Sequence, residues 1–155
     1  MLIPMKIDYA LRLLVYLSLH QDKGLIKTEE VSKDQGIPLK FLQRISNELQ
    51  KIGIIESTRG PLGGHKLTAD PKTLYVSNII KILDYSLSPV DCLDNEEVCI
   101  HTKSCSQREL WQDVEGVLFN HLSKISVHSL AKRLSLIHIS EPTRPLYISY
   151  AVFCL

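Results

Sequence analysis

Apolar residues recur at three- and four-residue steps along the first twenty positions of the chain. This spacing places them on one face of a helix over residues 6–20, with Asp8, Arg12 and Gln21 away from that face. The turn-forming run Asp22-Lys23-Gly24 ends the helix. The expected buried residues of this helix are Ile7, Ala10, Leu11, Leu14, Val15 and Leu17.

Two further helices are expected directly after it, separated by a glycine. Thr28 is a good N-cap for a short helix from Glu29 to Gln35, and Gly36 ends that helix. Pro38 suits the first turn of a longer helix, which Gly53 ends. One stripe of the longer helix is apolar (Leu39, Leu42, Ile45, Leu49, Ile52), and the opposite stripe is polar (Lys40, Gln43, Arg44, Asn47, Gln50, Lys51). Two helices joined in this way predict a helix-turn-helix.

Two short β-strands are expected next, at residues 54–57 and 65–67. The glycine-rich segment 58–64 between them carries a single arginine, Arg59. A helix-turn-helix followed by a β-hairpin is a winged helix. An arginine at the hairpin tip suits the negative potential of a DNA minor groove.

The remaining periodic segments predict one short and one long helix. Residues 76–83 form a helix that packs back on the winged domain. Residues 107–133 form a single helix of about 25 residues, or nearly 40 Å at about 1.5 Å per residue. A small winged domain cannot cover such a helix, so we expect a second subunit to pack on it. The expected fold is mostly α with a small β-wing, that is, a winged helix-turn-helix domain plus a long dimerisation helix.

Composition and charge are those of a globular protein with a mildly basic first half. Apolar residues make up 45% and charged residues 23% of 155 residues, and the net charge is +1. Residues 1–75 carry +3 (11 Lys/Arg, 8 Asp/Glu) and residues 76–133 carry −2 (6 and 8). The basic bias permits contact with a polyanion without establishing it. No secretory signal or membrane-spanning run is apparent, so a cytoplasmic location is expected.

Three of the four cysteines lie in the polar segment 91–105, which lacks apolar periodicity and is expected to be a loop. In a reducing compartment, clustered cysteines favour metal, cluster or redox chemistry over structural disulfides. A zinc site with His101 is an alternative, although the paired two-residue spacing of common structural zinc sites is absent. A thiol redox enzyme is disfavoured because the chain has no Cys-X-X-Cys, and no catalytic constellation is apparent.

Together these segments resemble the Rrf-two family of bacterial winged-helix regulators, of the IscR and NsrR type. The resemblance covers residues 1 to about 133. It rests on Asp8-Tyr9-Ala10-Leu11-Arg12, the helix-turn-helix at 28–51, the wing sequence from Arg59 to His65, and the three spaced cysteines. It implies a homodimer on a palindromic operator and, in many members, an iron–sulfur cluster, either 2Fe-2S or 4Fe-4S.

The resemblance also implies a set of cluster ligands. Three are Cys92, Cys99 and Cys105. The IscR branch has a histidine three residues after the last cysteine, where this chain has Arg108. The NsrR branch can use an aspartate of the first helix of the other subunit, a position that Asp8 occupies. His101, a water or a small thiol remains open as the fourth ligand.

The chain is accordingly divided into four parts: a winged helix-turn-helix domain (1–84), a cysteine-rich cluster-binding loop (85–106), a dimerisation helix (107–133), and a tail (134–155). The tail resembles translated cloning adapter, so we expect it to be non-native or disordered and set it aside with Cys154.

The sequence thus predicts a non-enzymatic DNA-binding regulator, expected to be a repressor, whose operator affinity is set by a cluster sensing redox, nitric oxide or iron status. A cluster-free regulator controlled by a partner protein is the alternative. The residues expected to contact DNA are Thr28, Pro38, Leu39, Lys40, Gln43, Arg44, Asn47, Lys51, Arg59 and Gly60.

Overall fold

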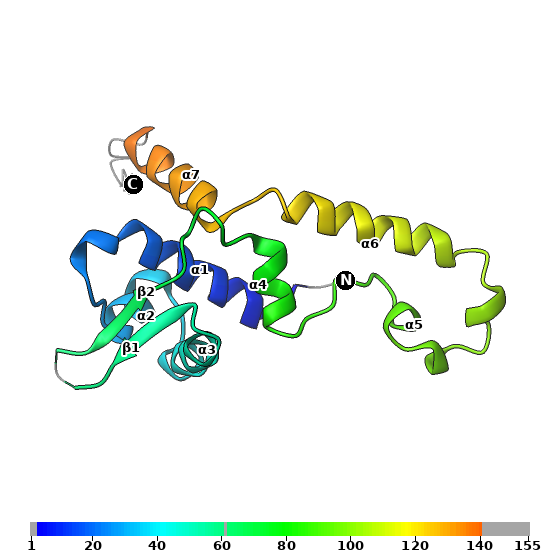
Figure 1. Cartoon of the computed structure of the whole chain (residues 1–155), viewed down its shortest axis with the longest axis horizontal. Helices are drawn as coiled ribbons and strands as arrows, with labels where there is room; N and C mark the ends of the chain where they lie inside the picture. The colour runs from blue at the N-terminus through cyan, green and yellow to red at the C-terminus, as the bar shows by residue number, and fades with distance from the viewer. Residues whose placement is uncertain (1–2, 61, 141–155) are drawn as a thin grey trace, which may run out of the picture.

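The computed structural model describes residues 3–60 and 62–140, which form a helical body and a projecting arm (Figure 1). The body begins with α1 (Met5–Leu19), the 3-10 turn η1 (Gln21–Lys23), α2 (Thr28–Gln35) and α3 (Leu39–Lys51). The hairpin β1 (Ile55–Thr58) and β2 (Gly64–Leu67) and the helix α4 (Val76–Ile82) follow. The remaining elements are α5 (Asp91–Asp94), the 3-10 turns η2 (Glu96–Val98) and η3 (Thr102–Ser104), α6 (Arg108–Leu122) and α7 (Val127–Ser140).

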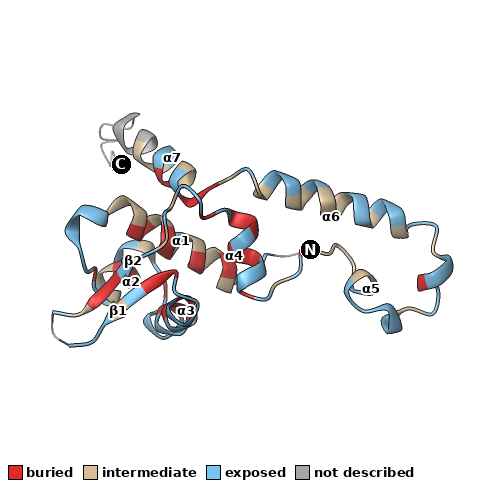
Figure 2. Cartoon of the chain, viewed as in Figure 1, coloured by how far each residue is buried: buried red, intermediate tan, exposed pale blue. Residues whose placement is uncertain are grey.

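The core of the body is built around α1. Of its expected apolar stripe, Ile7, Ala10, Leu14 and Leu17 are buried, whereas Leu11 and Val15 are half-buried. The helices α2, α3, α4 and α7 pack around α1. Figure 2 shows these buried positions converging in the body. The residues at the centre include Ile7, Leu13, Leu14, Leu17, Val31, Leu42, Leu49, Ile79 and Val127. The mostly helical winged fold expected from the sequence is therefore confirmed, as is the return of the 76–83 helix onto the body.

The hairpin forms the wing. β1 and β2 are antiparallel, with Ser57 opposite His65 and Glu56 opposite Lys66. Ile26, in the connection between α1 and α2, adds an isolated bridge to His65 on the free edge of β2. The wing is thereby attached to the helix-turn-helix through its second strand.

The prediction of one continuous helix over residues 107–133 is wrong. The structure has two helices there, α6 and α7, separated by residues 123–126. The connecting backbone pairs with the segment before α4: Val76 N–H donates to Ile125 O (2.9 Å) and Val127 N–H donates to Leu74 O (2.9 Å). The Ser126 hydroxyl accepts from Ser129 N–H (3.2 Å), as an N-cap does. This turn lets Val127 and Ala131 bury against the body.

The arm comprises α5, η2, η3 and α6, and it stands away from the body (Figures 1 and 2). Residues 91–105, expected as a loop, contain three single helical turns instead. Across residues 88–125, all of which the structure describes, Thr102 is the one buried residue. The arm therefore has almost no core of its own.

Two expectations at the ends of α3 are corrected. Leu39 and Ile52 belong to the predicted buried stripe but are 36% and 46% exposed, because they lie at the helix ends beyond the reach of α1.

In the predicted tail, α7 continues the chain as helix to Ser140, while residues 141–155, with Cys154, lie outside the described residues.

Candidate nucleic-acid interface and cysteine loop

The exposed face of α3 is the first candidate surface. Leu42, Ile45 and Leu49 are buried, and this orientation directs the opposite stripe to solvent. Pro38 is exposed, and so are all residues of the predicted polar stripe: Lys40, Gln43, Arg44, Asn47, Gln50 and Lys51. Within the described chain, an ion pair is found for only one of them, a 3.7 Å contact from Arg44 Nε to Glu48. Most of this polar face is thus unoccupied and available to a partner.

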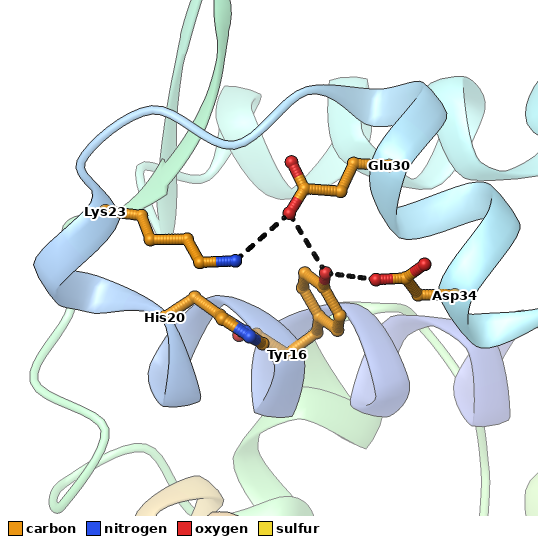
Figure 3. Close-up of polar contacts among 5 residues, drawn as sticks. All are labelled: Tyr16, His20, Lys23, Glu30 and Asp34. Carbon is orange, nitrogen blue, oxygen red and sulfur yellow. Dashed lines mark hydrogen bonds and ion pairs between the residues drawn. The ribbon is translucent and has the colours of Figure 1, made fainter.

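A polar cluster of Tyr16, His20, Lys23, Glu30 and Asp34 fixes α2 to α1 and so positions the first helix of the helix-turn-helix (Figure 3). The buried Tyr16 hydroxyl donates to Asp34 Oδ2 at 2.7 Å and also lies 3.2 Å from Glu30 Oε1. Burial, followed by the Asp34 hydrogen bond, raises the pKa of Tyr16, so the hydroxyl stays protonated and remains a donor. His20 stacks on the Tyr16 ring at 4.3 Å, and Lys23 pairs with Glu30 at 3.4 Å.

Thr28 is not the N-cap predicted from the sequence. Lys27 precedes the first helical residue and makes no side-chain cap, while Thr28 Oγ1 lies 2.8 Å from Nε2 of His65. The Thr28 hydroxyl therefore bonds to the His65 ring instead of capping α2. Thr28 is half-buried at the junction of α2 and the wing.

The wing tip holds Arg59 and Gly60, both exposed. Gly60 has φ of 113°, a conformation that side-chain-bearing residues rarely adopt, and its carbonyl accepts from Gly63 N–H at 2.9 Å. In Figure 1 the wing and α3 lie on the same side of the body, opposite α7. The tip that carries Arg59 therefore belongs to an element on the same side of the body as α3.

The three cysteines lie on successive turns of the arm. Cys92 is in α5, Cys99 follows η2 and Cys105 follows η3; each is a half-buried free thiol. Thr102, between the second and third, donates to Cys99 O at 2.7 Å. The thiols are thus held on a chain of short turns rather than on a regular helix.

Arg108 organises the same region. Its guanidinium donates to Cys92 O at 3.2 Å and to Glu96 Oε1 at 2.9 Å. Arg108 therefore ties α5 and η2 to the start of α6. Arginine cannot act as a metal ligand while it stays protonated.

Asp8 lies in the first turn of α1 and forms an ion pair with Arg12, one turn later, at 2.8 Å. Among the described residues no three His, Cys, Asp or Glu side chains are gathered closely enough to hold a metal ion. Within one protomer, the structure does not bring Asp8, His101 and the cysteines together as a closed site.

Sequence reasoning missed the roles of three residues: Tyr16, His65 and Arg108. Tyr16 falls on the apolar stripe of α1 and is indistinguishable from a core aromatic residue. His65 begins the second strand expected from the sequence, and its two hydroxyl partners are 8 and 37 positions away. The apolar pair Leu25-Ile26 between two predicted helices is the one signal that could have indicated an extra strand contact.

Among the helices that the structure describes, none combines the length and the apolar composition of a membrane span.

Two relatives are similar over most of their length. The HTH-type transcriptional regulator IscR of Xenorhabdus nematophila is 29% identical over 133 residues, which cover 86% of this chain and 80% of the relative. IscR of Aliivibrio salmonicida is 30% identical over 122 residues, which cover 79% and 72%.

Solved structures give the same fold. CymR of B. subtilis, described as its global cysteine regulator, has a TM-score of 0.70 at 24% identity, covering 86% of this chain and 98% of CymR. IscR of T. potens has a TM-score of 0.70 at 20% identity, covering 94% of each chain. The model of the Rrf2 family, described as iron-dependent transcriptional regulator, matches residues 3–133. The chain therefore belongs to the Rrf2 family of transcriptional regulators, whose members are not enzymes.

Proposed function

We propose that this transcriptional regulator is a cytoplasmic homodimeric repressor that binds a palindromic operator with α3 and the wing, and that an iron–sulfur cluster on its arm sets operator affinity. The observation that carries the DNA-binding part is the exposed polar stripe of α3, a helix that lies on the same side of the body as the wing.

On DNA, the residues of α3 divide into two groups by chemistry. Lys40 and Lys51 neutralise phosphates, while Gln43, Arg44 and Asn47 reach base edges in the major groove. Arg59 enters the adjacent minor groove. Pro38, Leu39 and Gly60 bring backbone and apolar surface close to the duplex, and Thr28 lies at the junction of α2 and the wing.

The dimer is supported by the outer side of α6. Leu110 is 55% and Val117 68% exposed, and Val114 lies between them at helical spacing. At about 100° per residue these three share one side, whereas Gln112, Glu115 and Phe119 line a cavity of about 430 Å³ against the end of α4. A second copy of α6 packed on the outer side would bury the stripe. It would also set the separation of the two α3 helices, which must reach half-sites about 34 Å apart.

The donor chemistry of the arm fits an iron–sulfur cluster, because three free thiols lie on one short segment and thiolates are its usual ligands. Cys92, Cys99 and Cys105 would hold it, with Asp8 of the second copy as fourth ligand. When bound, such a cluster supplies sensitivity to redox state, nitric oxide or iron. The half-exposed Asp8 carboxylate is held by Arg12 alone among the ion pairs of the described residues, so exchange to another cation costs little.

A selection from a random double-stranded DNA pool with the full chain tests the DNA-binding part. The selected duplex is then titrated by fluorescence anisotropy. Arg44→Ala should weaken binding by about 5- to 150-fold and relax the preference at one base pair. Lys40→Ala should weaken all sequences alike and lower the salt slope by about one. Lys132→Ala, on α7 at the opposite side of the body, is the matched control. An equal loss from Lys132→Ala and Arg44→Ala would contradict the interface.

Anaerobic purification tests the cluster. The protein should be brown, with iron and sulfide in equal amounts, and Cys92→Ala, Cys99→Ala and Cys105→Ala should each be colourless. Asp8→Ala should destabilise the cluster without abolishing its assembly.

A cluster-free regulator is the second candidate. It is favoured by the Arg108 contacts, which order α5 through protein groups alone. A colourless anaerobic protein that binds the selected duplex would establish this candidate and overturn the cluster assignment.

A further inference from the structure

The wing is joined to the helix-turn-helix through a short backbone contact at Ile26. Ile26 N–H donates to His65 O at 2.9 Å, and His65 N–H donates to Ile26 O at 2.8 Å. The chains come so close that a methyl group on Gly64 would lie 2.5 Å from the Ile26 carbonyl oxygen. Only glycine fits at this position, so the approach of the α1–α2 connection to β2 is fixed by the backbone itself.

The His65 side chain completes the joint. Its Nε2 lies 2.8 Å from Thr28 Oγ1 at the start of α2, and its Nδ1 lies 2.7 Å from Ser57 Oγ on β1. A neutral imidazole has one N–H and one acceptor nitrogen, so one hydroxyl accepts and the other donates. Both ring nitrogens are therefore used, and the ring connects three segments: α2, β1 and β2.

Several features separate this arrangement from ordinary core packing. His65 is 8% exposed and is one of few buried polar side chains in the described chain, and burial lowers its pKa, which keeps the ring neutral. An apolar residue would fill the same space without orienting anything. The neighbouring charges are Glu29, which faces the ring from α2, and the Lys66–Glu56 pair (3.0 Å), which alternates to the other face of the hairpin.

We propose that His65 is a positioning residue that sets the place of the wing relative to α2 and α3, through its hydrogen bonds to Thr28 and Ser57. The wing has no other long-range side-chain hydrogen bond to α2 among the described residues. If the bonds are lost, the hairpin keeps its internal pairing and its backbone bridge to Ile26, but its position relative to α2 and α3 is less closely defined. The consequence of this positioning for DNA binding rests on the proposed function, because it requires that Arg59 and α3 contact the same duplex.

Amide hydrogen exchange on the free, full-length protein tests the joint without DNA. In His65→Phe, which keeps a ring but removes both bonds, residues 25–28 and 55–67 should exchange about tenfold faster, while the interior of α3 is unchanged. Ser57→Ala keeps the histidine and removes one bond, so it should give a smaller increase at the same segments. Glu56→Gln, on the opposite face of β1, is the control. Unchanged exchange at 25–28 and 55–67 in both His65→Phe and Ser57→Ala overturns the proposal.

A double-mutant cycle on the selected duplex tests the consequence. Arg59→Ala should cost about tenfold in affinity in the natural background. In His65→Phe the same change should cost less than about threefold, because a displaced wing no longer delivers the arginine. Equal costs in the two backgrounds overturn the link between the joint and DNA. If Arg59→Ala has no effect in either background, the proposed wing contact fails, while the exchange result still decides the role of His65.

Discussion

The body and the arm carry apolar stripes with the same helical spacing, and they bury them to very different extents. In α1 the residues Ile7, Leu14 and Leu17 are at most 1% exposed, because α3, α4 and α7 of the same chain surround them. In α6 the residues Leu110 and Val117 are more than half exposed, because α6 belongs to the arm, which stands away from the body (Figure 1). Periodicity thus predicts that a helix has a face to cover. Whether the same chain covers it depends on where the connections lead.

The difference extends to polar contacts. In the body, Tyr16 and His65 are buried and use their polar atoms to join elements that are distant in sequence. In the arm, the Arg108 guanidinium donates to the carbonyl of Cys92 and to the exposed Glu96 carboxylate. The polar contacts of the body therefore involve buried side chains set in a core, whereas those of the arm include an exposed carboxylate in a segment with almost no core.

The largest effect is expected from a cavity in the body. Leu42→Ala removes a side chain with 0% exposure from the junction of α3 and α1. It should lower the free energy of unfolding by about 2–5 kcal/mol, measured by urea denaturation. Leu110→Ala in α6, measured with the protein diluted to monomer, should change it by less than about 0.5 kcal/mol. Similar losses for the two variants would contradict the contrast between body and arm.

The second effect is on association. Val117→Asp places a carboxylate in the outer stripe of α6, where burial against a second subunit is unfavourable. The dissociation constant of the proposed dimer should rise roughly hundredfold in sedimentation experiments, with the circular dichroism of the chain unchanged. Ser106→Asp adds the same charge ahead of the helix and should leave association unchanged. A dimer that tolerates Val117→Asp would place the interface elsewhere.

A smaller, local effect is expected at Arg108. Arg108→Ala removes two hydrogen bonds, and the side chain is 23% exposed, so about 1 kcal/mol of local stability should be lost after allowance for solvent. Hydrogen exchange in residues 91–98 should accelerate severalfold while α1 stays protected. The matched variant Arg133→Ala, on α7, should not affect these amides. Simultaneous acceleration in α1 would show that the arm and the body unfold as one unit.

The smallest effect is a pH dependence at His65. Burial lowers its pKa, so the unfolded chain takes up a proton more readily than the folded chain. The contribution of the neutral His65 ring to the free energy of unfolding is fully present above about pH 6.5. It is lost as the pH falls, by at most about 1.4 kcal/mol per pH unit. The difference in unfolding free energy between the natural protein and His65→Phe should therefore shrink from pH 7.5 to pH 5.5. A difference that grows on acidification would mean that the folded state stabilises the charged ring.

The sequence by itself determined the local elements of this protein. Repeating apolar positions identified α1, α3 and α4, and Gly36 and Gly53 ended helices at positive φ (63° and 78°) as predicted. The polar stripe of α3 followed from the apolar one because the two share a single helical repeat. The cysteine composition of residues 91–105 indicated the thiol segment, and the order of the segments along the chain indicated the family. Each local element could be predicted because its pattern depends only on residues a few positions apart.

Tertiary structure decided how those parts are connected in space. The break between α6 and α7 follows from the pairing of residues 125–127 with 74–76. Thr28 bonds His65 rather than capping its helix because the wing brings a ring nitrogen to it. Arg108 holds α5 because the arm folds back on the start of α6. For Thr28 the outcome is a competition for one hydroxyl between a local capping role and a partner that the fold supplies. The other two outcomes depend on contacts between separate segments, which local sequence patterns do not register.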